Sequence, residues 1–104
     1  MFKSIYKKLK EDFAFLSDYG FTYKFELKHF EVPSILYERN ILEIEIGFNY
    51  RVDKFYINVS INKDYRNAMR LLDNVALPGK TYKEQVEIVK KYLRVYLDDV
   101  SQND

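Results

Sequence analysis

The sequence predicts a single α+β domain over residues 1–104: an N-terminal helix, an antiparallel meander of three to four strands, and two C-terminal helices packed on one face of the sheet. Three observations lead to this prediction. The 104 residues are 47% hydrophobic, which suits one domain with one core. Near both ends of the chain, apolar residues recur at three- and four-residue spacing. Over residues 21–62 they alternate with polar residues at every second position, which is typical of strands.

Residues 1–19 are expected to form the first helix. The segment combines an apolar stripe with a lysine-rich side, and Gly20 is a natural stop. The stripe consists of Phe2, Ile5, Tyr6, Leu9, Phe13 and Leu16. We interpret the lysine-rich side as solvated helix surface.

Residues 21–62 are expected to form the antiparallel sheet, with one face turned toward the helices. The clearest strands lie on either side of the connection 51–54, and two strands joined in this way form a β-hairpin. Gly47 lies inside one of them, which indicates a bulge or a close approach to the backbone. Before the hairpin, one strand ends at Pro33 and residues 35–37 offer a short second strand. The predicted inward residues are Phe21, Tyr23, Phe25, Leu27, Leu42, Ile44, Ile46, Phe48, Tyr50, Phe55, Ile57, Val59 and Ile61.

Residues 64–100 are expected to form two helices, followed by a frayed tail over residues 101–104. The first of these helices is short and ends near Asn74, with a loop over residues 77–80 after it. Thr81 and Glu84 match a capping box, in which each side chain satisfies a backbone donor at the start of the second helix. The apolar stripe of that helix comprises Tyr82, Val86, Val89, Leu93, Tyr96 or Leu97, and Val100.

Charge, cysteine and histidine content argue against several kinds of site. The chain has 17 Lys and Arg against 16 Asp and Glu, a weaker basic excess than dedicated nucleic-acid binders carry. The absence of Cys removes disulfides, thiolate nucleophiles and the usual zinc sites, and a single His cannot build a histidine metal cluster. No apolar run is long enough for a signal peptide or a membrane span, so we expect a cytoplasmic protein.

No set of catalytic residues stands out. A nucleophilic triad would need His29 beside a serine and a carboxylate, and we interpret His29 as an ordinary residue at a strand end. Glu43 and Glu45 share a strand face, which is compatible with a glycosidase pair or a metal site but also with ordinary solvent-facing surface. Residues 79–81 are similar to the end of a phosphate-binding loop but lack its upstream glycine. We therefore predict no enzyme activity, no cofactor, no metal and no small-molecule substrate.

Binding to another protein is the class of function that the composition favours. The chain has ten Tyr, a residue enriched at protein interfaces. Binding of single-stranded nucleic acid, in which aromatic rings stack on bases, is the alternative, together with other small adaptor roles. Outward carboxylates at Glu43 and Glu45 would repel phosphate, so nucleic acid is the less favoured partner. The aromatic residues that remain as outward candidates are Tyr19, Tyr37, Tyr56 and Tyr65.

Four short segments also follow one another in a recognisable order. They are Phe13–Phe21, which reads F-x-F-L-x-x-Y-G-F; the turn Tyr37–Asn40; the strand Ile44–Arg51; and a closing segment with Tyr92, Leu93 and Leu97. This series resembles small bacterial immunity proteins of polymorphic toxin and contact-dependent growth inhibition systems, with Asn49 and Tyr50 as departures from the pattern. The resemblance implies an inhibitor that binds one cognate toxin domain in a heterodimer and blocks its active site without chemistry of its own.

The resemblance also implies what kind of surface should bind the toxin. Many such toxins are nucleases with basic clefts, and an acidic surface can mimic the phosphate that these clefts bind. We expect no membrane partner, and a nucleic-acid partner is the less favoured alternative. The candidate partner-binding residues are Glu31, Tyr37, Glu38, Glu43, Glu45, Asp53, Tyr56 and Asn58.

Overall fold

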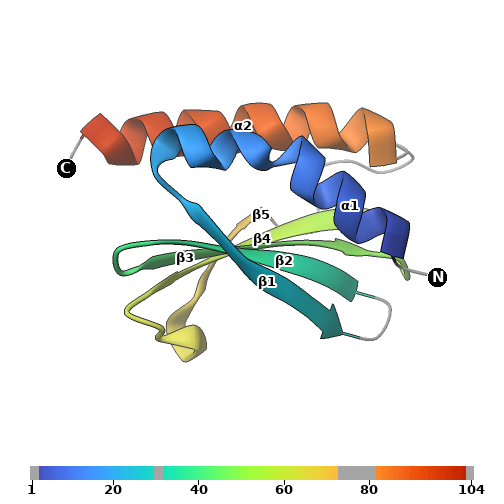
Figure 1. Cartoon of the computed structure of the whole chain (residues 1–104), viewed down its shortest axis with the longest axis horizontal. Coiled ribbons are helices and arrows are strands. Elements are labelled where there is room, and N and C mark those ends of the chain that lie inside the picture. Colours follow the sequence, from blue (N-terminus) through green and yellow to red (C-terminus); the bar gives the residue numbers. More distant parts are fainter. Residues whose placement is uncertain (1–2, 30–31, 73–81, 103–104) are drawn as a thin grey trace.

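An antiparallel sheet with helices along one of its faces makes up the computed structural model, which describes residues 3–29, 32–72 and 82–102 (Figure 1). The strands follow the chain order β1-β2-β3-β4-β5, and every neighbouring pair is antiparallel. The predicted α+β class and antiparallel meander are confirmed, with one strand more than expected. The elements are α1 (Lys3–Asp12), the 3-10 helix η1 (Ala14–Tyr19), β1 (Thr22–His29), β2 (Val32–Arg39), β3 (Leu42–Asn49), β4 (Lys54–Ile61), the 3-10 helix η2 (Tyr65–Asn67), β5 (Met69–Leu72) and α2 (Tyr82–Gln102).

The N-terminal helix is divided into two parts rather than continuous to Tyr19. The α-helix α1 ends at Asp12, and the tighter helix η1 begins after Phe13. In a 3-10 helix, residues three apart lie on the same side, so Phe13 and Leu16 both point into the core. Gly20 ends the segment as predicted, because its backbone adopts the left-handed conformation with φ of 85° and its N–H bonds to the carbonyl oxygen of Ser17.

A β-bulge changes the faces of β1 halfway along the strand. The register with β2 shifts between Tyr23 and Phe25, so Tyr23 points toward the helices while Phe25 and Leu27 lie on the opposite face. The predicted alternation was therefore wrong for Phe25 and Leu27, because one extra residue reverses the face of every residue that follows it. Phe25 is consequently 48% exposed.

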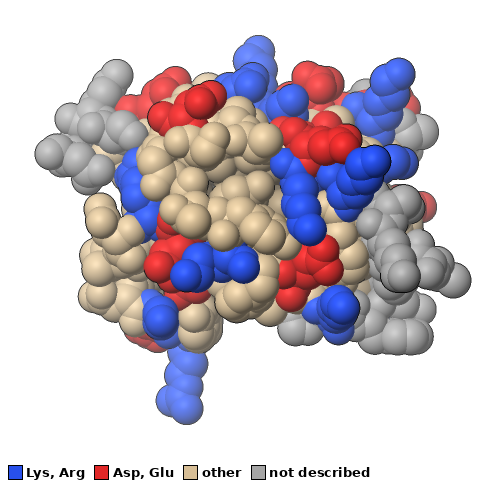
Figure 2. Space-filling view, viewed as in Figure 1, with Lys and Arg blue, Asp and Glu red and all other residues tan. Residues whose placement is uncertain are grey.

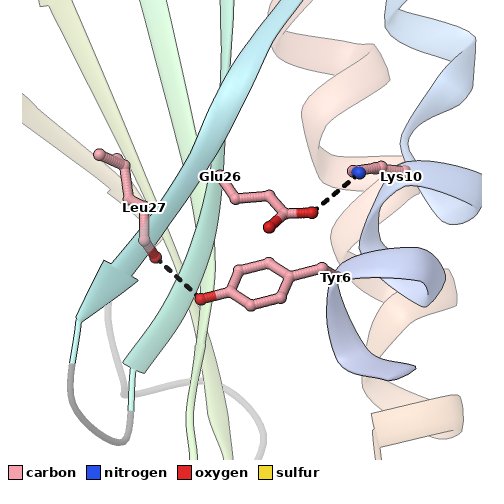
Figure 3. Close-up of polar contacts among 4 residues, drawn as sticks. All are labelled: Tyr6, Lys10, Glu26 and Leu27. Carbon is pink, nitrogen blue, oxygen red and sulfur yellow. Dashed lines mark hydrogen bonds and ion pairs between the residues drawn. The ribbon is translucent and has the colours of Figure 1, made fainter. Parts of the chain in front are cut away.

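The same bulge turns Glu26 toward α1, and two polar contacts fasten this helix to the edge strand (Figure 3). The ammonium group of Lys10 lies 2.9 Å from the Glu26 carboxylate. The Tyr6 hydroxyl donates to the carbonyl oxygen of Leu27 at 3.2 Å. Burial, followed by the charge of Glu26, raises the pKa of Tyr6. The Tyr6 hydroxyl thus bonds to a backbone carbonyl group of β1, which is an edge strand of the sheet.

The segment predicted as the first C-terminal helix is mostly a strand. Asp64 precedes the short helix η2, and residues 69–72 form β5, which pairs with β4. The helix prediction for residues 69–72 was wrong because a short apolar run fits either a strand or a helix, and here pairing with β4 decides the outcome. Two C-terminal helices are not confirmed: within the described residues, α2 is the α-helix that follows the sheet. Asn74, the loop 77–80 and Thr81 lie outside the described residues.

The core lies between the sheet and the helices. The predicted stripe on α2 is confirmed, with Val86, Val89, Leu93 and Leu97 buried. The helix also runs through Gln102, so the expected fraying was wrong for residues 101–102. The buried residues of this core are Ile5, Tyr6, Leu9, Phe13, Leu16, Phe21, Ile35, Tyr37, Ile44, Ile46, Phe48, Phe55, Ile57, Val59, Val86, Val89, Leu93 and Leu97.

One polar residue, Gln85, lies fully buried at the edge of this core and connects α2 to the β3–β4 hairpin. Its amide nitrogen donates to the carbonyl oxygen of Asp53, and its amide oxygen accepts from the N–H of Phe55 at 3.3 Å. Because buried amide groups are costly when they lack partners, these two bonds fix where α2 begins on the sheet.

Candidate functional site

Both α-helices lie on the same side of the sheet. On the opposite side, which we call the open face, the described part of the chain adds only the small η2 turn at one end (Figure 1). The predicted outward residues of β3 and β4 lie on the open face. The cross-strand register places Glu43 opposite Ser60, Glu45 opposite Asn58, and Gly47 opposite Tyr56. From β2, the open face receives Ser34, Leu36 and Glu38, which pair with β3.

The open face is much less solvated than its polar sequence suggests. Ser34 is completely buried and Glu43 is only 4% exposed, and Ser60 and Tyr56 are buried too. The prediction that Glu43 and Glu45 share a face was correct, but ordinary solvent-facing surface, one of the alternatives for this pair, was wrong for Glu43. The hydroxyl and aromatic side chains on the face cover one another and the carboxylates.

Glu45 is held by two hydroxyl groups. One of its carboxylate oxygens accepts from the Ser34 hydroxyl at 2.9 Å and from the Tyr56 hydroxyl at 2.6 Å. Tyr56 reaches this oxygen because its ring lies over Gly47: a Cβ atom at position 47 would be 2.6 Å from the Tyr56 hydroxyl oxygen. Of the two alternatives for Gly47, the close approach is therefore confirmed, and neither neighbouring strand shows a register shift there.

Glu43 is held by a tyrosine from outside the sheet. Its carboxylate accepts from the Tyr65 hydroxyl at 2.8 Å, and this hydrogen bond is the main reason that the pKa of Tyr65 is raised. Glu38 stands directly opposite Glu43 across the β2–β3 pair. Because the two carboxylates occupy directly opposed positions, they concentrate negative charge in this part of the open face. Like charges placed in this way repel each other.

A shallow pocket of about 190 Å³ opens beside these two carboxylates. Two turns contribute to its walls: the β2–β3 turn, which contains Ile41, and the turn after β4, which contains Asn62. A hydrogen bond joins them, in which the N–H of Asn62 donates to the carbonyl oxygen of Ile41 at 2.8 Å. Both turns use left-handed backbone, with φ of 54° at Asn40, 56° at Asn62 and 59° at Lys63. Asparagine tolerates this conformation better than most residues do, which explains its place in both turns. The pocket is lined by Glu38, Asn40, Ile41, Glu43, Asn62 and Lys63.

Two of the predicted partner-binding residues lie away from this group. Tyr37 is buried on the helix-covered face, where its ring packs edge-on against Tyr23 at 5.6 Å and burial raises its pKa. The prediction that Tyr37 points outward was wrong, because its neighbours Leu36 and Glu38 occupy the open face. Asp53 lies in the β3–β4 turn, at the far end of that hairpin from Glu43.

The structure thus brings together Glu38, Glu43, Glu45, Tyr56 and Asn58 on the open face, while Glu31 lies outside the described residues. Sequence reasoning missed the anchoring role of Ser34 and the contribution of Tyr65. The alternation of Ser34, Leu36 and Glu38 with the buried Ile35 and Tyr37 could have placed Ser34 on the open face. No comparable signal pointed to Tyr65, since its contact joins residues 22 positions apart.

Charge is mixed on the side of the molecule seen in Figure 2. Lys and Arg side chains alternate there with Asp and Glu over the helices and the first strands. Opposite charges also meet in one contact between α1 and β1, where the Lys10 ammonium group pairs with the Glu26 carboxylate. This side of the molecule therefore does not present a surface of one charge sign.

Among the described residues, no helix is long and apolar enough to cross a membrane, and no three His, Cys, Asp or Glu side chains gather in a way that could hold a metal ion. No family model, curated protein or solved structure matches this chain.

Proposed function

We propose that this protein is an immunity-type inhibitor, which binds a cognate toxin domain of nuclease type in a heterodimer and blocks its active site. The observation that carries the proposal is the row of carboxylates at Glu38, Glu43 and Glu45 on the open face of the sheet. Their strands fix their spacing, and hydroxyl groups orient two of them. Negative charge at fixed positions is what a partner with a basic cleft would recognise.

Rigid support strengthens this proposal. A side chain that is already ordered loses less conformational entropy on binding than a flexible one does. Glu45 has two hydroxyl donors and Glu43 has one, whereas a typical surface glutamate samples many rotamers. Carboxylates accept up to about four hydrogen bonds, so both residues keep acceptor capacity for a partner.

The alternative partner is single-stranded nucleic acid, and the exposed rings of Phe25 and Tyr65 are the observation in its favour. Exposed aromatic rings can stack on bases. The same surface, however, places carboxylates where the phosphates of a stacked strand would need cations. Inhibition of a basic protein is therefore better supported than binding of nucleic acid.

Co-expression with a toxin-like protein encoded beside this chain tests the proposal. An immunity protein should restore growth and co-purify with the toxin domain in a one-to-one complex. Glu38→Gln should weaken protection, whereas the matched control Asp18→Asn, which removes an exposed carboxylate on the helix side, should protect fully. Failure of the unaltered protein to protect against any adjacent toxin-like protein would reject the proposal. Single-strand binding that weakens steeply with salt would favour the alternative.

A further inference from the structure

The pocket between the two turns is suited to a single side chain rather than to a small-molecule ligand. Its volume of about 190 Å³ is below the ~300–1,000 Å³ of typical ligand pockets. It opens at the surface where the β2–β3 turn meets the turn after β4. An incoming chain could therefore place one residue in it without rearrangement of the sheet.

The charge inside the pocket favours a cation. Glu43 is 4% exposed and has one hydrogen-bond donor, Tyr65, so most of its acceptor capacity is unused within the described part of the chain. Glu38 lies opposite it on the next strand. A guanidinium group is planar and carries five N–H donors, so it can bond to two carboxylates at once. The Lys63 side chain also lines the pocket, so one cationic residue stands beside the two carboxylates.

The rim of the pocket adds apolar and aromatic surface. Ile41 lines the pocket and is 54% exposed, while Tyr65, which bonds to Glu43, is 60% exposed. A guanidinium group stacks favourably on a tyrosine ring, and the arginine stem packs on aliphatic surface. Asn40 and Asn62 also line the pocket, and an asparagine side chain carries an amide oxygen that can accept a hydrogen bond. Carboxylate and aliphatic surface at the pocket, with an exposed tyrosine ring bonded to one of its carboxylates, is a combination that recognises arginine.

We propose that this pocket receives an arginine side chain from a partner protein, with Glu38 and Glu43 as the anion pair and Ile41 and Tyr65 as the rim. The inference deepens the proposed function, on which it rests, because it identifies the group that a toxin domain would present. It also specifies where the toxin domain would make its main contact, which is the pocket at the two turns. The centre of the open face, where two hydroxyl groups already bond to Glu45, would contribute less.

Titration of the free protein with doubly blocked arginine amide, followed by NMR of the backbone amides, tests the pocket without any toxin. Saturable shifts should concentrate in residues 40–43 and 62–65, with weak millimolar affinity. The citrulline analogue, which has the same shape without the charge, should leave these amides unchanged. Glu38→Gln should weaken arginine binding ~10-fold, as expected for loss of one charge-assisted bond, and the matched control Asp18→Asn should not.

Three results of the titration would overturn the pocket assignment. They are equal shifts with citrulline, shifts scattered over distant carboxylates, and arginine binding that Glu38→Gln leaves intact. Stronger shifts of the same amides with a short single-stranded oligonucleotide would also overturn it, because they would identify a nucleic-acid site.

A second measurement uses the toxin domain that co-purifies with the protein. Ile41→Ser should lower its affinity ~10-fold, whereas Ile88→Ser, a matched exposed isoleucine on α2, should leave it unchanged. The two proposals can then fail separately. Growth rescue without arginine binding, or equal affinity of the two serine variants, rejects the pocket alone. Arginine binding without rescue rejects the immunity function and leaves the pocket in place.

Discussion

The two faces of the sheet are buried by different means. On the covered face, apolar side chains pack beneath α1 and α2, as Phe55 and Leu93 do. On the open face, polar groups such as Ser34 and Glu43 are as little exposed as many core residues, although no α-helix of the described chain lies over them (Figure 1). The comparison shows that burial in this protein does not require apolar residues. It requires either a helix layer or side chains long enough to cover one another.

Tyrosine has a different task on each face. On the covered side, tyrosine hydroxyls connect the helices: Tyr82 donates to Asp12 at 2.9 Å, and Tyr19 donates to Asp98 at 2.8 Å. On the open face, Tyr56 and Tyr65 hold carboxylates of the sheet. The tyrosine-rich composition therefore serves packing on one side and orientation of charge on the other.

The largest effect is expected from breaking the covered face at Phe55. Its buried ring packs against Phe13, Phe48 and Tyr82, with ring centres 6.1, 5.1 and 5.0 Å away. Phe55→Ala would leave a cavity among these rings and should lower the free energy of unfolding by about 3–5 kcal/mol. Urea denaturation measures this change. Phe25→Ala on the open face is the matched control and should cost about 1 kcal/mol or less, because that ring is half exposed.

A smaller loss is expected where the open face is packed most closely, at Gly47. Gly47→Ala would place a methyl group in the space of the Tyr56 ring, so the ring must move and release Glu45. We expect a loss of about 1–3 kcal/mol, typical of overpacking. A double-mutant cycle with Tyr56→Leu checks the cause, since a smaller side chain at position 56 should remove most of the penalty. Additive effects of the two changes would contradict the contact.

The Tyr56 hydroxyl alone is expected to contribute less than the ring does. Tyr56→Phe keeps the cover over Gly47 but leaves the Glu45 carboxylate with Ser34 as its hydroxyl donor. A lost hydrogen bond to a charged group costs about 1.5–3 kcal/mol when buried, and partial solvation should bring this to about 1–2 kcal/mol. Tyr92→Phe, at an exposed position on α2, is the control and should be neutral. Equal stability of Tyr56→Phe and the unaltered protein would contradict the role of the hydroxyl.

The covered face could largely be predicted from the sequence, because periodicity records which residues meet the core. The stripe on α2 and the inward residues Ile44, Ile46 and Ile57 follow this pattern. The prediction failed for Phe25, because the bulge near Lys24 adds one residue to β1 and reverses the alternation of faces after it. It also failed over residues 69–72, where pairing with β4 outweighs local spacing.

The candidate site was predictable in part. Alternation placed Glu43, Glu45 and Tyr56 on the open face, but it could not tell that Glu43 and Tyr56 would be buried. Their burial depends on contacts such as Tyr65 to Glu43, which link segments far apart in the chain. The pocket depends on two turns that meet through one backbone hydrogen bond, from Asn62 to Ile41, and periodicity contains no information about that meeting.

The smallest effect expected is a dependence on alkaline pH, and it originates on the covered side. Burial, followed by the hydrogen bond to Asp12, raises the pKa of Tyr82 well above its usual value of 10.0. Below pH about 10 this tyrosine is neutral in both the folded and the unfolded chain, so its full contribution to stability is present. As the pH rises further, the unfolded chain loses the phenolic proton first. The folded state then holds more protons than the unfolded state, and the free energy of unfolding must fall.

Partial exposure of Tyr82 limits the slope to about 1 kcal/mol or less per pH unit. Urea denaturation between about pH 9 and 11 measures it, and Tyr82→Phe should flatten the curve because phenylalanine has no proton to lose. Tyr92→Phe, at an exposed position on α2, is the control and should leave the slope unchanged. Equal slopes for Tyr82→Phe and the unaltered protein would show that the covered face does not hold this hydroxyl in its neutral form. The alkaline loss of stability would then have to originate in other tyrosines whose pKa is raised, among them Tyr65 on the open face.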